Sequence, residues 1–351
     1  MLDRGQIKRI LVRSTNWLGD AVMTTPAISA IRESFPGAYI SILATPLVAE
    51  MFSRHADVDE VIVYDRRGRH GGLRGKFRIA AELRERKFDL AILLQNAIDA
   101  AIITFLAGIP KRMGYRTDGR GFLLTHGCPV TPETGRLHHV DYYLAMLGMF
   151  GITTSVKHQR LTVTPEERES VDGLLSANGI ARSDFVLGVN PGATYGSAKR
   201  WYPDRFAAVA DRLSAEWGAR VVITGGPGEA AIAADIEREM THPCLNMAGK
   251  TTVRELMALI ERCDFFISND SGPMHMAAAF DVPVVAVFGP TDHTTTSPFS
   301  SKMVIVRKET DCAPCMLREC PTDHRCMTAV TVEQVVDAAA ELKSKQRVID
   351  A

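Results

Sequence analysis

The chain has 351 residues, about twice the usual size of a single domain, which predicts two domains. Its hydrophobic fraction of 46% is that of an ordinary globular protein, and its 41 basic residues balance 41 acidic ones, which argues against nucleic acid as the main partner. No apolar run approaches the roughly 18 residues that a membrane span needs, and the first residues lack the apolar core of a signal peptide. We therefore expect a cytoplasmic protein without a transmembrane segment, whose contact with a membrane would be peripheral.

The first half of the chain alternates short apolar runs with amphipathic stretches. The predicted strands cover residues 10–13, 39–45, 58–65 and 88–96, and the predicted helices cover 21–35, 47–55, 79–87, 97–108 and 138–152. This alternation predicts a doubly wound parallel sheet. The third strand and the third helix are joined by a loop, Arg66–Arg78, that is rich in arginine and glycine. Its glycines predict that the loop is mobile when nothing is bound.

A polar stretch at residues 153–167 is the predicted connection between domains, because the same alternation begins again after it. Strands with their turns are predicted at 184–193, 219–229, 244–249, 265–268, 284–288 and 302–308, and helices at 167–180, 202–219, 230–240, 252–263 and 331–346. We therefore predict an α/β protein with two Rossmann-like, doubly wound parallel-sheet domains that face a cleft. The predicted domains are residues 1–165 and 166–330, followed by a C-terminal helix at 331–351.

The stretch Phe265–Asp292 carries the strongest pattern in the chain. It reads as a buried strand, a polar turn, a short helix of small residues, a second buried strand and a second turn. Pro273 suits the first turn of the helix, and Ser271 and Gly272 precede it where unpaired backbone N–H groups collect. Such a helix start at the carboxyl end of parallel strands is a typical anion site. The alternative is a packing unit without a ligand.

Asp20 lies in the turn that joins the first strand to the first helix. An aspartate there is either a helix N-cap, which stabilises a helix by about 1 kcal/mol, or a general base at the edge of the first sheet.

The segment at residues 190–203 is a strand end followed by a glycine-rich turn. Thr194 offers a hydroxyl, and Lys199 and Arg200 offer two adjacent positive charges, a combination that suits a diphosphate. The alternative is a solvated loop. His275 could donate to the same phosphate or be a structural histidine. The chain lacks a dinucleotide fingerprint, and its glycine-rich stretch at 225–229 lacks the lysine of a P-loop, so neither NAD binding nor ATP hydrolysis is indicated.

Basic residues gather in the first half of the chain. The loop Arg66–Arg78 carries Arg66, Arg67, Arg69, Arg74, Lys76 and Arg78 and no acidic residue. Such a loop is either simply solvated or suited to a phosphorylated or membrane-surface acceptor. Nearby, Asp57 and Asp59 match a D-x-D metal pattern, but acidic residues just before an edge-like strand are expected to cap and solubilise it, so we do not predict a metal there.

Four of the seven cysteines fall close together near the C-terminus. Cys312, Cys315, Cys320 and Cys326 have the spacing C-x2-C-x4-C-x5-C, with His324 inside. This spacing resembles that of metal ligands, so a structural metal or cluster is one interpretation. Disulfides and free thiols are the others. The three scattered cysteines are expected to be small buried residues.

Four segments carry a resemblance to a known family. They are NWLGDAVMTTPA at 16–27, FLAGIPKRMGYRTDGRGFLL at 105–124, NPGATYGSAKRW at 190–201 and NDSGPMHMAAAFDVPVVAVFGPTD at 269–292. Together they resemble the ADP-heptose:lipopolysaccharide heptosyltransferases of glycosyltransferase family 9, and the likeness runs from about residue 8 to about residue 308. The W-L-G-D and P-G-A-x-x-G-x-A-K-R-W motifs favour the branch that adds the second heptose, heptosyltransferase II. The cysteine segment departs from the family pattern.

The resemblance implies a GT-B fold with an acceptor domain, a donor domain and a terminal helix that packs back across. It implies a donor, ADP-L-glycero-β-D-manno-heptose, and inverting transfer onto the first heptose of a lipid A–Kdo–heptose acceptor at the cytoplasmic face of the inner membrane. No cofactor and no metal are implied for catalysis. By resemblance Asp20 is the base and Lys199 holds the donor phosphates. The remaining implied or candidate contacts are Thr194, Arg200, Glu229, Asp270, Ser271, Gly272 and His275 for the donor, and Asn16, Arg66, Arg67, Arg69, Arg116 and Arg120 for the acceptor.

Three rival functions stay open at this point. A family member could add a different heptose or another nucleotide-activated sugar to a core saccharide. A nucleotide-sugar-binding protein without turnover would need the same phosphate cradle. An epimerase acting on a nucleotide sugar would share the fold but need no acceptor.

Overall fold

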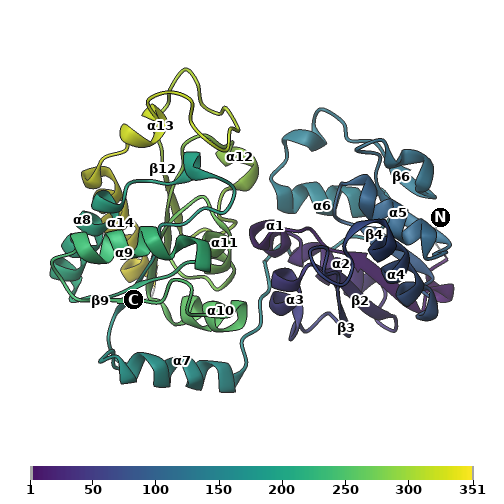
Figure 1. Ribbon diagram of the computed structural model, residues 1–351, viewed down its shortest axis with the longest axis horizontal. Helices are drawn as coiled ribbons and strands as arrows, with labels where there is room; N and C mark the ends of the chain where they lie inside the picture. Colours follow the sequence, from purple (N-terminus) through teal and green to yellow (C-terminus); the bar gives the residue numbers. More distant parts are fainter. Residues whose placement is uncertain (1–2, 350–351) are drawn as a thin grey trace. The chain divides into compact units, whose positions relative to one another are not determined.

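The computed structural model describes residues 3–349. The chain divides into two compact units, Met1–Thr162 and Val163–Ala351, and each unit is built on one six-stranded parallel sheet (Figure 1). The predicted α/β class with two doubly wound parallel sheets is confirmed. The observed division falls at residues 162 and 163, within the predicted polar connection.

The first sheet has the strand order β3-β2-β1-β4-β5-β6. Its strands are β1 (Arg9–Arg13), β2 (Tyr39–Ala44), β3 (Glu60–Val63), β4 (Leu90–Leu93), β5 (Lys111–Tyr115) and β6 (His126–Cys128). The order reverses between β1 and β4, so the turn after β1 lies at the point where open α/β sheets hold ligands. The sequence did not predict β5 and β6, because these short strands contain lysine, arginine and glycine in place of an apolar run.

The helices of the first unit cover both faces of this sheet. They are α1 (Leu18–Met23), α2 (Thr25–Ser34), α3 (Pro46–Phe52), α4 (Gly72–Glu85), α5 (Ile98–Leu106) and α6 (His139–Gly148), with short 3-10 turns η1 (Arg4–Gln6), η2 (Arg120–Leu123) and η3 (Thr134–Arg136). The single helix predicted at 21–35 is two helices, which meet at Thr24, and Pro26 lies in the first turn of the second. The mobile loop predicted at 66–78 is wrong in its second half, because α4 begins at Gly72.

The second sheet has the order β12-β11-β10-β7-β8-β9. Its strands are β7 (Val186–Asn190), β8 (Arg220–Ile223), β9 (Cys244–Asn246), β10 (Phe265–Asn269), β11 (Val284–Val287) and β12 (Met303–Val306). The central strands β7 and β10 pair in parallel, with Ser268 opposite Asn190. Their carboxyl ends are therefore neighbours. The loop at 191–201 and the turn at 270–271 consequently leave the same edge of the sheet side by side.

The helices of the second unit include the last helix of the chain. They are α7 (Pro165–Ala177), α8 (Pro203–Trp217), α9 (Ala230–Glu239), α10 (Val253–Arg262), α11 (Gly272–Ala279), α12 (His293–Thr296), α13 (Arg325–Thr328) and α14 (Val332–Ile349), with η4 (Ser197–Lys199) and η5 (Pro227–Glu229). Val335, Ala339 and Leu342 of α14 are buried in one cluster with Trp201 and Phe206. The terminal helix is thus part of the core of this unit. Residues 350 and 351 of the predicted helix lie outside the described residues.

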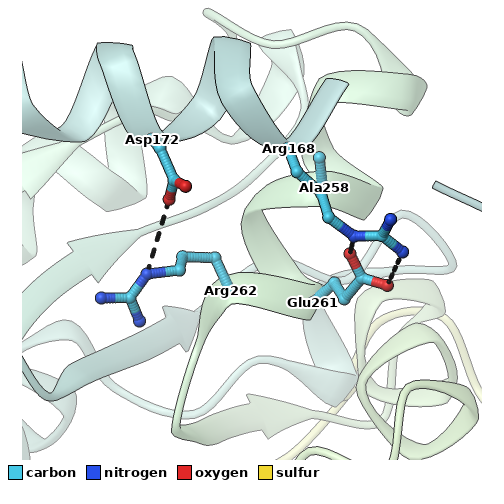
Figure 2. A pocket seen from close by; sticks show the side chains of 5 residues that line it. All are labelled: Arg168, Asp172, Ala258, Glu261 and Arg262. Atoms are coloured by element: carbon cyan, nitrogen blue, oxygen red, sulfur yellow. Dashed lines mark hydrogen bonds and ion pairs between the residues drawn. The ribbon is translucent and has the colours of Figure 1, made fainter. Parts of the chain in front are cut away.

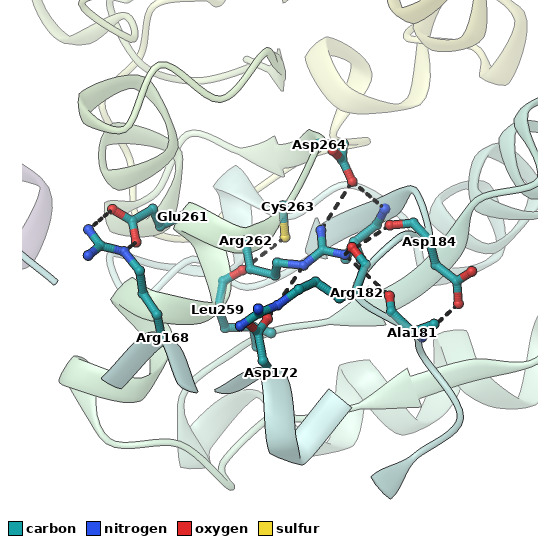
Figure 3. Close-up of polar contacts among 11 residues, drawn as sticks. Arg168, Asp172, Ala181, Arg182, Asp184, Leu259, Glu261, Arg262, Cys263 and Asp264 are labelled. Atoms are coloured by element: carbon teal, nitrogen blue, oxygen red, sulfur yellow. Dashed lines mark hydrogen bonds and ion pairs between the residues drawn. The ribbon is translucent and has the colours of Figure 1, made fainter. Parts of the chain in front are cut away.

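Ion pairs fasten α7, the first helix of the second unit, to α10. The Arg168 guanidinium donates to both oxygens of Glu261, at 2.6 and 2.8 Å, and Arg262 lies 3.7 Å from Asp172 (Figure 2). Arg262 also donates to the backbone carbonyl of Asp184, at 2.9 Å (Figure 3). Because α10 leads directly into β10, these contacts join the start of the unit to the strand that ends at the candidate site.

Candidate functional site

A compact group of three side chains lies at the carboxyl edge of the second sheet. Lys199 ends the 3-10 turn η4 after β7, and Asp270 directly follows β10. The Lys199 Nζ lies 2.6 Å from Asp270 Oδ2, and the two side chains are only 13% and 5% exposed. Thr291, from the loop after β11, donates its hydroxyl to the same carboxylate oxygen at 2.6 Å. Three strands thus bring one cation, one anion and one hydroxyl together.

Asn269 fixes the loop that carries Lys199. This fully buried residue ends β10; its Nδ2 donates to the Pro191 carbonyl at 2.6 Å, and its Oδ1 accepts from the Trp201 backbone N–H at 3.1 Å. One amide therefore ties both ends of the loop at 191–201 to the central strand. The sequence alone does not reveal this role, because an asparagine at a strand end indicates only the start of a turn.

A second set of polar contacts positions the start of α11. The Asn190 Nδ2 donates to the Ser271 hydroxyl at 3.0 Å, and Ser268 shares a hydrogen bond of 3.0 Å with the same hydroxyl. On its other side Asn190 accepts from the Thr224 hydroxyl at 3.2 Å. Ser271 is the N-cap residue of α11, yet its side chain makes no capping bond to that helix. The first-turn amides of α11 are therefore not occupied by their own N-cap.

Glu229 lies beside the same loop. Its carboxylate accepts from the Gly226 N–H at 2.8 Å, and it packs so closely against Gly192 that a Cβ there would stand 2.0 Å from the Glu229 Cδ. Only glycine at residue 192 allows this approach. The turn that ends β8 and the loop that follows β7 are therefore neighbours, which places Glu229 beside Lys199's loop.

The other predicted donor residues differ in exposure. Thr194 is exposed, Arg200 and Gly272 are partly buried, and His275 is almost fully buried within α11, with 3% of its surface exposed. The Arg200 guanidinium lies 3.4 Å from the Ala193 carbonyl. The structure thus brings Thr194, Lys199, Arg200, Asp270, Ser271 and Gly272 to one sheet edge, whereas the His275 side chain lies in the interior.

In the first unit, Asp20 stands in the first turn of α1. The N-cap residue of that helix is Trp17, so the N-cap interpretation of Asp20 is wrong. The Asp20 carboxylate is partly exposed and lies 3.9 Å from the Nδ1 of His139, the first residue of α6. Burial, and after it the charge of Asp20, raise the pKa of Tyr143 well above its ordinary value. The carboxylate is therefore held at the switch point of the first sheet, beside α6.

Buried arginines hold the loops around Asp20. Arg13 donates to the Asn16 side chain at 2.8 Å, and Arg120 donates to the Tyr115 carbonyl at 2.8 Å and to the Asn96 side chain at 3.2 Å. Burial lowers the pKa of each arginine to about 10. Arg120, a predicted acceptor residue, is fully buried and bonded inside the unit, which favours a structural role.

The other predicted acceptor cations are exposed. Arg66, Arg67, Arg69 and Arg116 all reach the surface, and Arg69 forms an ion pair of 2.5 Å with Glu82. The turn that holds Arg66, Arg67 and Arg69 is stabilised by Asp65, whose carboxylate accepts from the N–H groups of Gly68 and Arg69 at 2.9 and 3.2 Å. These hydrogen bonds give the first half of the predicted loop a defined turn conformation.

The predicted structural metal site is not assembled. Cys312, Cys315, Cys320 and Cys326 are free thiols, and Cys326 is buried whereas Cys312 is exposed. Within residues 3–349, no three His, Cys, Asp or Glu side chains are arranged to hold a metal ion. The spacing of the cysteines alone did not predict how the chain folds between them.

A surface hollow of about 270 Å³ lies between α7 and α10, and none of the predicted site residues lines it (Figure 2). It is lined by Arg168, Asp172, Ala258, Glu261 and Arg262. Because its arginines face carboxylates at short range, the hollow offers no free positive charge to an anionic ligand. We therefore do not consider it the functional site.

Comparison with known proteins identifies the family. The sequence profile of Glycosyltransferase family 9 (heptosyltransferase) matches residues 76–325. The chain belongs to this family. It is therefore a glycosyltransferase, and the predicted enzyme class is confirmed.

Individual relatives are similar to this chain over most of its length. Lipopolysaccharide heptosyltransferase 2 of Salmonella typhimurium is 31% identical over 312 residues, which cover 85% of this chain and 88% of that protein. The structure of ADP-heptose lipopolysaccharide heptosyltransferase II of Escherichia coli is 26% identical, with a TM-score of 0.83 over 97% of this chain and 99% of that one. A family 9 glycosyltransferase of Veillonella parvula, also 26% identical, has a TM-score of 0.87 over 97% and 98%.

Within residues 3–349, no helix combines the length and the apolar composition that crossing a membrane requires.

Replacing Asn269 tests how the Lys199 loop is held. We expect Asn269→Ala to lower the free energy of unfolding of the second unit by about 2–4 kcal/mol, because it leaves the buried Pro191 carbonyl and the Trp201 N–H without partners. Urea unfolding measures this change. Asn178→Ala removes the same side chain from an exposed helix end and should change the free energy by less than about 0.5 kcal/mol. Equal effects of the two variants would contradict the assignment.

Proposed function

We propose that the chain transfers L-glycero-D-manno-heptose from ADP-heptose to the first heptose of a lipid A–Kdo–heptose acceptor, as heptosyltransferase II. The observation that carries the proposal is the Lys199–Asp270–Thr291 group at the edge of the second sheet. Family membership and the names of the relatives support heptose as the sugar. The W-L-G-D and P-G-A-x-x-G-x-A-K-R-W motifs support the second-heptose branch.

The donor site in this proposal lies in the second unit. Lys199 and Arg200 supply two positive charges, and the start of α11 supplies backbone N–H groups and the positive end of a helix dipole. Both suit a diphosphate. Asp270, held by Thr291 and Lys199, accepts hydrogen bonds from heptose hydroxyls, and Glu229 accepts from the ribose. In this proposal His275, whose side chain is buried in α11, stabilises the helix start that binds the diphosphate.

The proposed reaction is a single displacement with inversion. Asp20 removes the proton from the acceptor hydroxyl, and the resulting oxygen attacks the anomeric carbon of the heptose. The bond between that carbon and the β-phosphate oxygen breaks, and ADP leaves with the bonding electrons. Lys199 and Arg200 stabilise the negative charge that grows on this phosphate. Asn16 and the exposed arginines Arg66, Arg67, Arg69 and Arg116 are the candidate contacts for the acceptor. The two cations and the helix start already provide the neutralising charge, so the proposal assigns no catalytic metal.

A transfer assay tests the proposal and its rivals. Purified protein is incubated with ADP-heptose and, in separate reactions, with heptose-free, one-heptose and two-heptose lipid A–Kdo acceptors. The masses of the products are measured by mass spectrometry. We expect one heptose to be added to the one-heptose acceptor alone. Addition only to another acceptor would identify a different family member, and absence of any addition, with donor binding retained, would favour a binding protein.

We expect Asp20→Ala to abolish transfer while changing the affinity for ADP-heptose by less than about threefold. General-base catalysis contributes roughly 10²- to 10⁴-fold, and the Asp20 side chain belongs to the unit that lacks the donor residues. Single-turnover kinetics and calorimetric titration with ADP-heptose measure the two effects. Loss of donor affinity in a variant with an unchanged unfolding midpoint would contradict the base role.

We expect Lys199→Ala to weaken donor binding and to lower kcat together, with kcat/KM reduced roughly 10²- to 10³-fold, because an electrostatic contact to the leaving phosphate disappears. Steady-state kinetics with ADP-heptose as the varied substrate measure both constants. Lys250→Ala, which removes an exposed lysine of the same unit, is the control. Wild-type kinetics in Lys199→Ala would contradict the phosphate assignment.

The first unit carries a surface that suits the membrane in which such an acceptor resides. Leu73 and Phe77 lie one helical turn apart on α4 and are 74% and 60% exposed. Exposed cations surround them in sequence, namely Arg66, Arg67, Arg74 and Arg78. A pair of exposed apolar side chains flanked by arginines is typical of a surface that rests on anionic lipid headgroups. We include peripheral binding through α4, on the cytoplasmic face of the inner membrane, in the proposed function.

We expect the double variant Leu73→Ser and Phe77→Ser to lose at least tenfold in affinity for vesicles that contain phosphatidylglycerol, as measured by co-sedimentation. Leu47→Ser is the control, because Leu47 is 59% exposed and lies on a different helix, α3, which packs beside α1. Vesicles of phosphatidylcholine alone should bind all three proteins weakly. Unchanged binding of the double variant would exclude this surface.

A further inference from the structure

The connection between β12 and α13 is long and lacks regular structure. We call residues 307–328, which comprise this connection and α13, the cysteine segment; it holds Cys312, Cys315, Cys320, Cys326 and His324. Figure 1 shows it in yellow, extending beyond the end of the second sheet near α12. The proposed reaction uses none of its residues. Its contacts, however, are made with the loops that carry the candidate donor site.

The cysteine segment binds the loop of Lys199 through its backbone. The Ala198 N–H donates to the Arg318 carbonyl at 3.0 Å, and the Tyr195 hydroxyl donates to the Met316 carbonyl at 2.7 Å. The Tyr195 ring also lies 5.2 Å from the Arg318 guanidinium and 4.9 Å from the Lys199 ammonium. One aromatic ring is thus shared by a cation of the segment and by the candidate phosphate ligand.

His324 holds the residue immediately before Lys199. Its Nε2 lies 2.7 Å from the Ala198 carbonyl, and its Nδ1 lies 3.2 Å from the Tyr202 hydroxyl. A carbonyl only accepts, so Nε2 carries the hydrogen, and in the neutral ring Nδ1 accepts from the tyrosine. One imidazole therefore joins positions 198 and 202, which flank Lys199 on both sides.

The segment reaches the second loop of the site as well. The Met316 N–H donates to the Pro290 carbonyl at 2.9 Å, next to Thr291. Met327 packs against Gly289, where a Cβ would stand 2.4 Å from its Sδ. The same segment therefore contacts the loop of Lys199 and the loop of Thr291, and these two side chains meet on Asp270.

We propose that the cysteine segment is a brace for the donor site and that His324 is a positioning residue for Lys199. By fixing the Ala198 carbonyl, His324 sets the backbone from which the Lys199 side chain extends toward Asp270. Displacement of that backbone by about 1 Å would move the ammonium out of hydrogen-bond range of a bound phosphate. This role rests on the proposed function, because it assumes that Lys199 acts on the donor diphosphate. His324 itself touches no reacting atom.

Gly196 offers a second way to disturb the same contact. A Cβ at Gly196 would stand 2.1 Å from the Arg318 carbonyl oxygen, which is backbone and cannot turn aside. The φ of Gly196 is 168°, an extended value that any residue adopts, so alanine there introduces a clash and no backbone strain. Gly196→Ala should therefore push the backbone at Arg318 away from the loop while leaving the His324 side chain unaltered.

The test compares four variants with the wild type. His324→Ala removes both hydrogen bonds, and His324→Gln retains an N–H donor and an oxygen acceptor on a side chain of similar reach. Gly196→Ala separates the two backbones, and Glu319→Ala, at an exposed position of the segment, is the control. Hydrogen–deuterium exchange of residues 196–202 is measured without substrate, together with ADP affinity by calorimetry, kcat, and the KM for each substrate.

We expect His324→Ala and Gly196→Ala to raise amide exchange at residues 198–202 at least tenfold. In both, ADP affinity and kcat should fall about tenfold while the acceptor KM stays within twofold. His324→Gln should recover most of each loss, and Glu319→Ala should match the wild type. The brace is refuted if exchange rises without any change in ADP affinity, if exchange stays at the wild-type level in both variants, or if His324→Gln recovers nothing although it folds. Exchange and ADP affinity need no heptose transfer, so a wild type that transfers no heptose overturns the proposed function and leaves these two readouts decisive for the brace.

Discussion

The ion pair between Lys199 and Asp270 is the interaction on which the second unit is organised. Taking two charges out of water costs several kcal/mol per ion, and their mutual attraction offsets this cost only if the geometry is good and further hydrogen bonds satisfy the remaining atoms. At 2.6 Å, with Thr291 bonded to the same carboxylate, this pair meets that condition. It lies at the carboxyl edge of the sheet, where we propose that the donor binds, and not in the hydrophobic core. In the proposed reaction this pair exchanges part of its mutual attraction for contacts with the diphosphate and the sugar of the donor.

Two sets of contacts fix the position of the loop that carries Lys199 relative to Asp270. From inside the sheet, Asn269 ties both ends of the Lys199 loop to β10, the strand that Asp270 directly follows. From outside, His324 and the backbone of the cysteine segment hold the same loop. The first unit repeats the scheme on a smaller scale, since buried Arg13 fixes Asn16 in the turn that leads to Asp20. In both units the loop that carries the candidate residue is thus held by hydrogen bonds to buried side chains.

The sequence predicted the fold well where a local pattern carries it. Apolar runs located four strands of the first sheet and all six of the second, and Pro273 with the small residues after it located α11. Polar residues in the segments that follow those strands indicated Lys199, Asp270 and Asp20 as site candidates. Strands β5 and β6 escaped prediction because they are short and carry lysine, arginine, glycine and histidine in place of an apolar run, and only β6 is an edge strand, where such residues are tolerated. The start of α4 escaped because its first turn is rich in glycine and arginine, and tertiary packing overrode that composition.

The remaining parts of the site depend on contacts between residues far apart in the chain. The roles of Asn269 and His324 follow from their hydrogen bonds to Pro191, Trp201 and Ala198. The spacing of these residues in the sequence does not predict those contacts. Arg120 was predicted to be an acceptor contact, but it is fully buried and donates to the Asn96 side chain. The central claim is that Lys199 and Asp270 receive the donor, and a crystal structure of the protein with bound ADP-heptose tests it most directly. The account predicts the Lys199 Nζ within about 3 Å of a β-phosphate oxygen and Asp270 bonded to heptose hydroxyls. ADP-heptose bound elsewhere, with Lys199 contacting Asp270 alone, would contradict it.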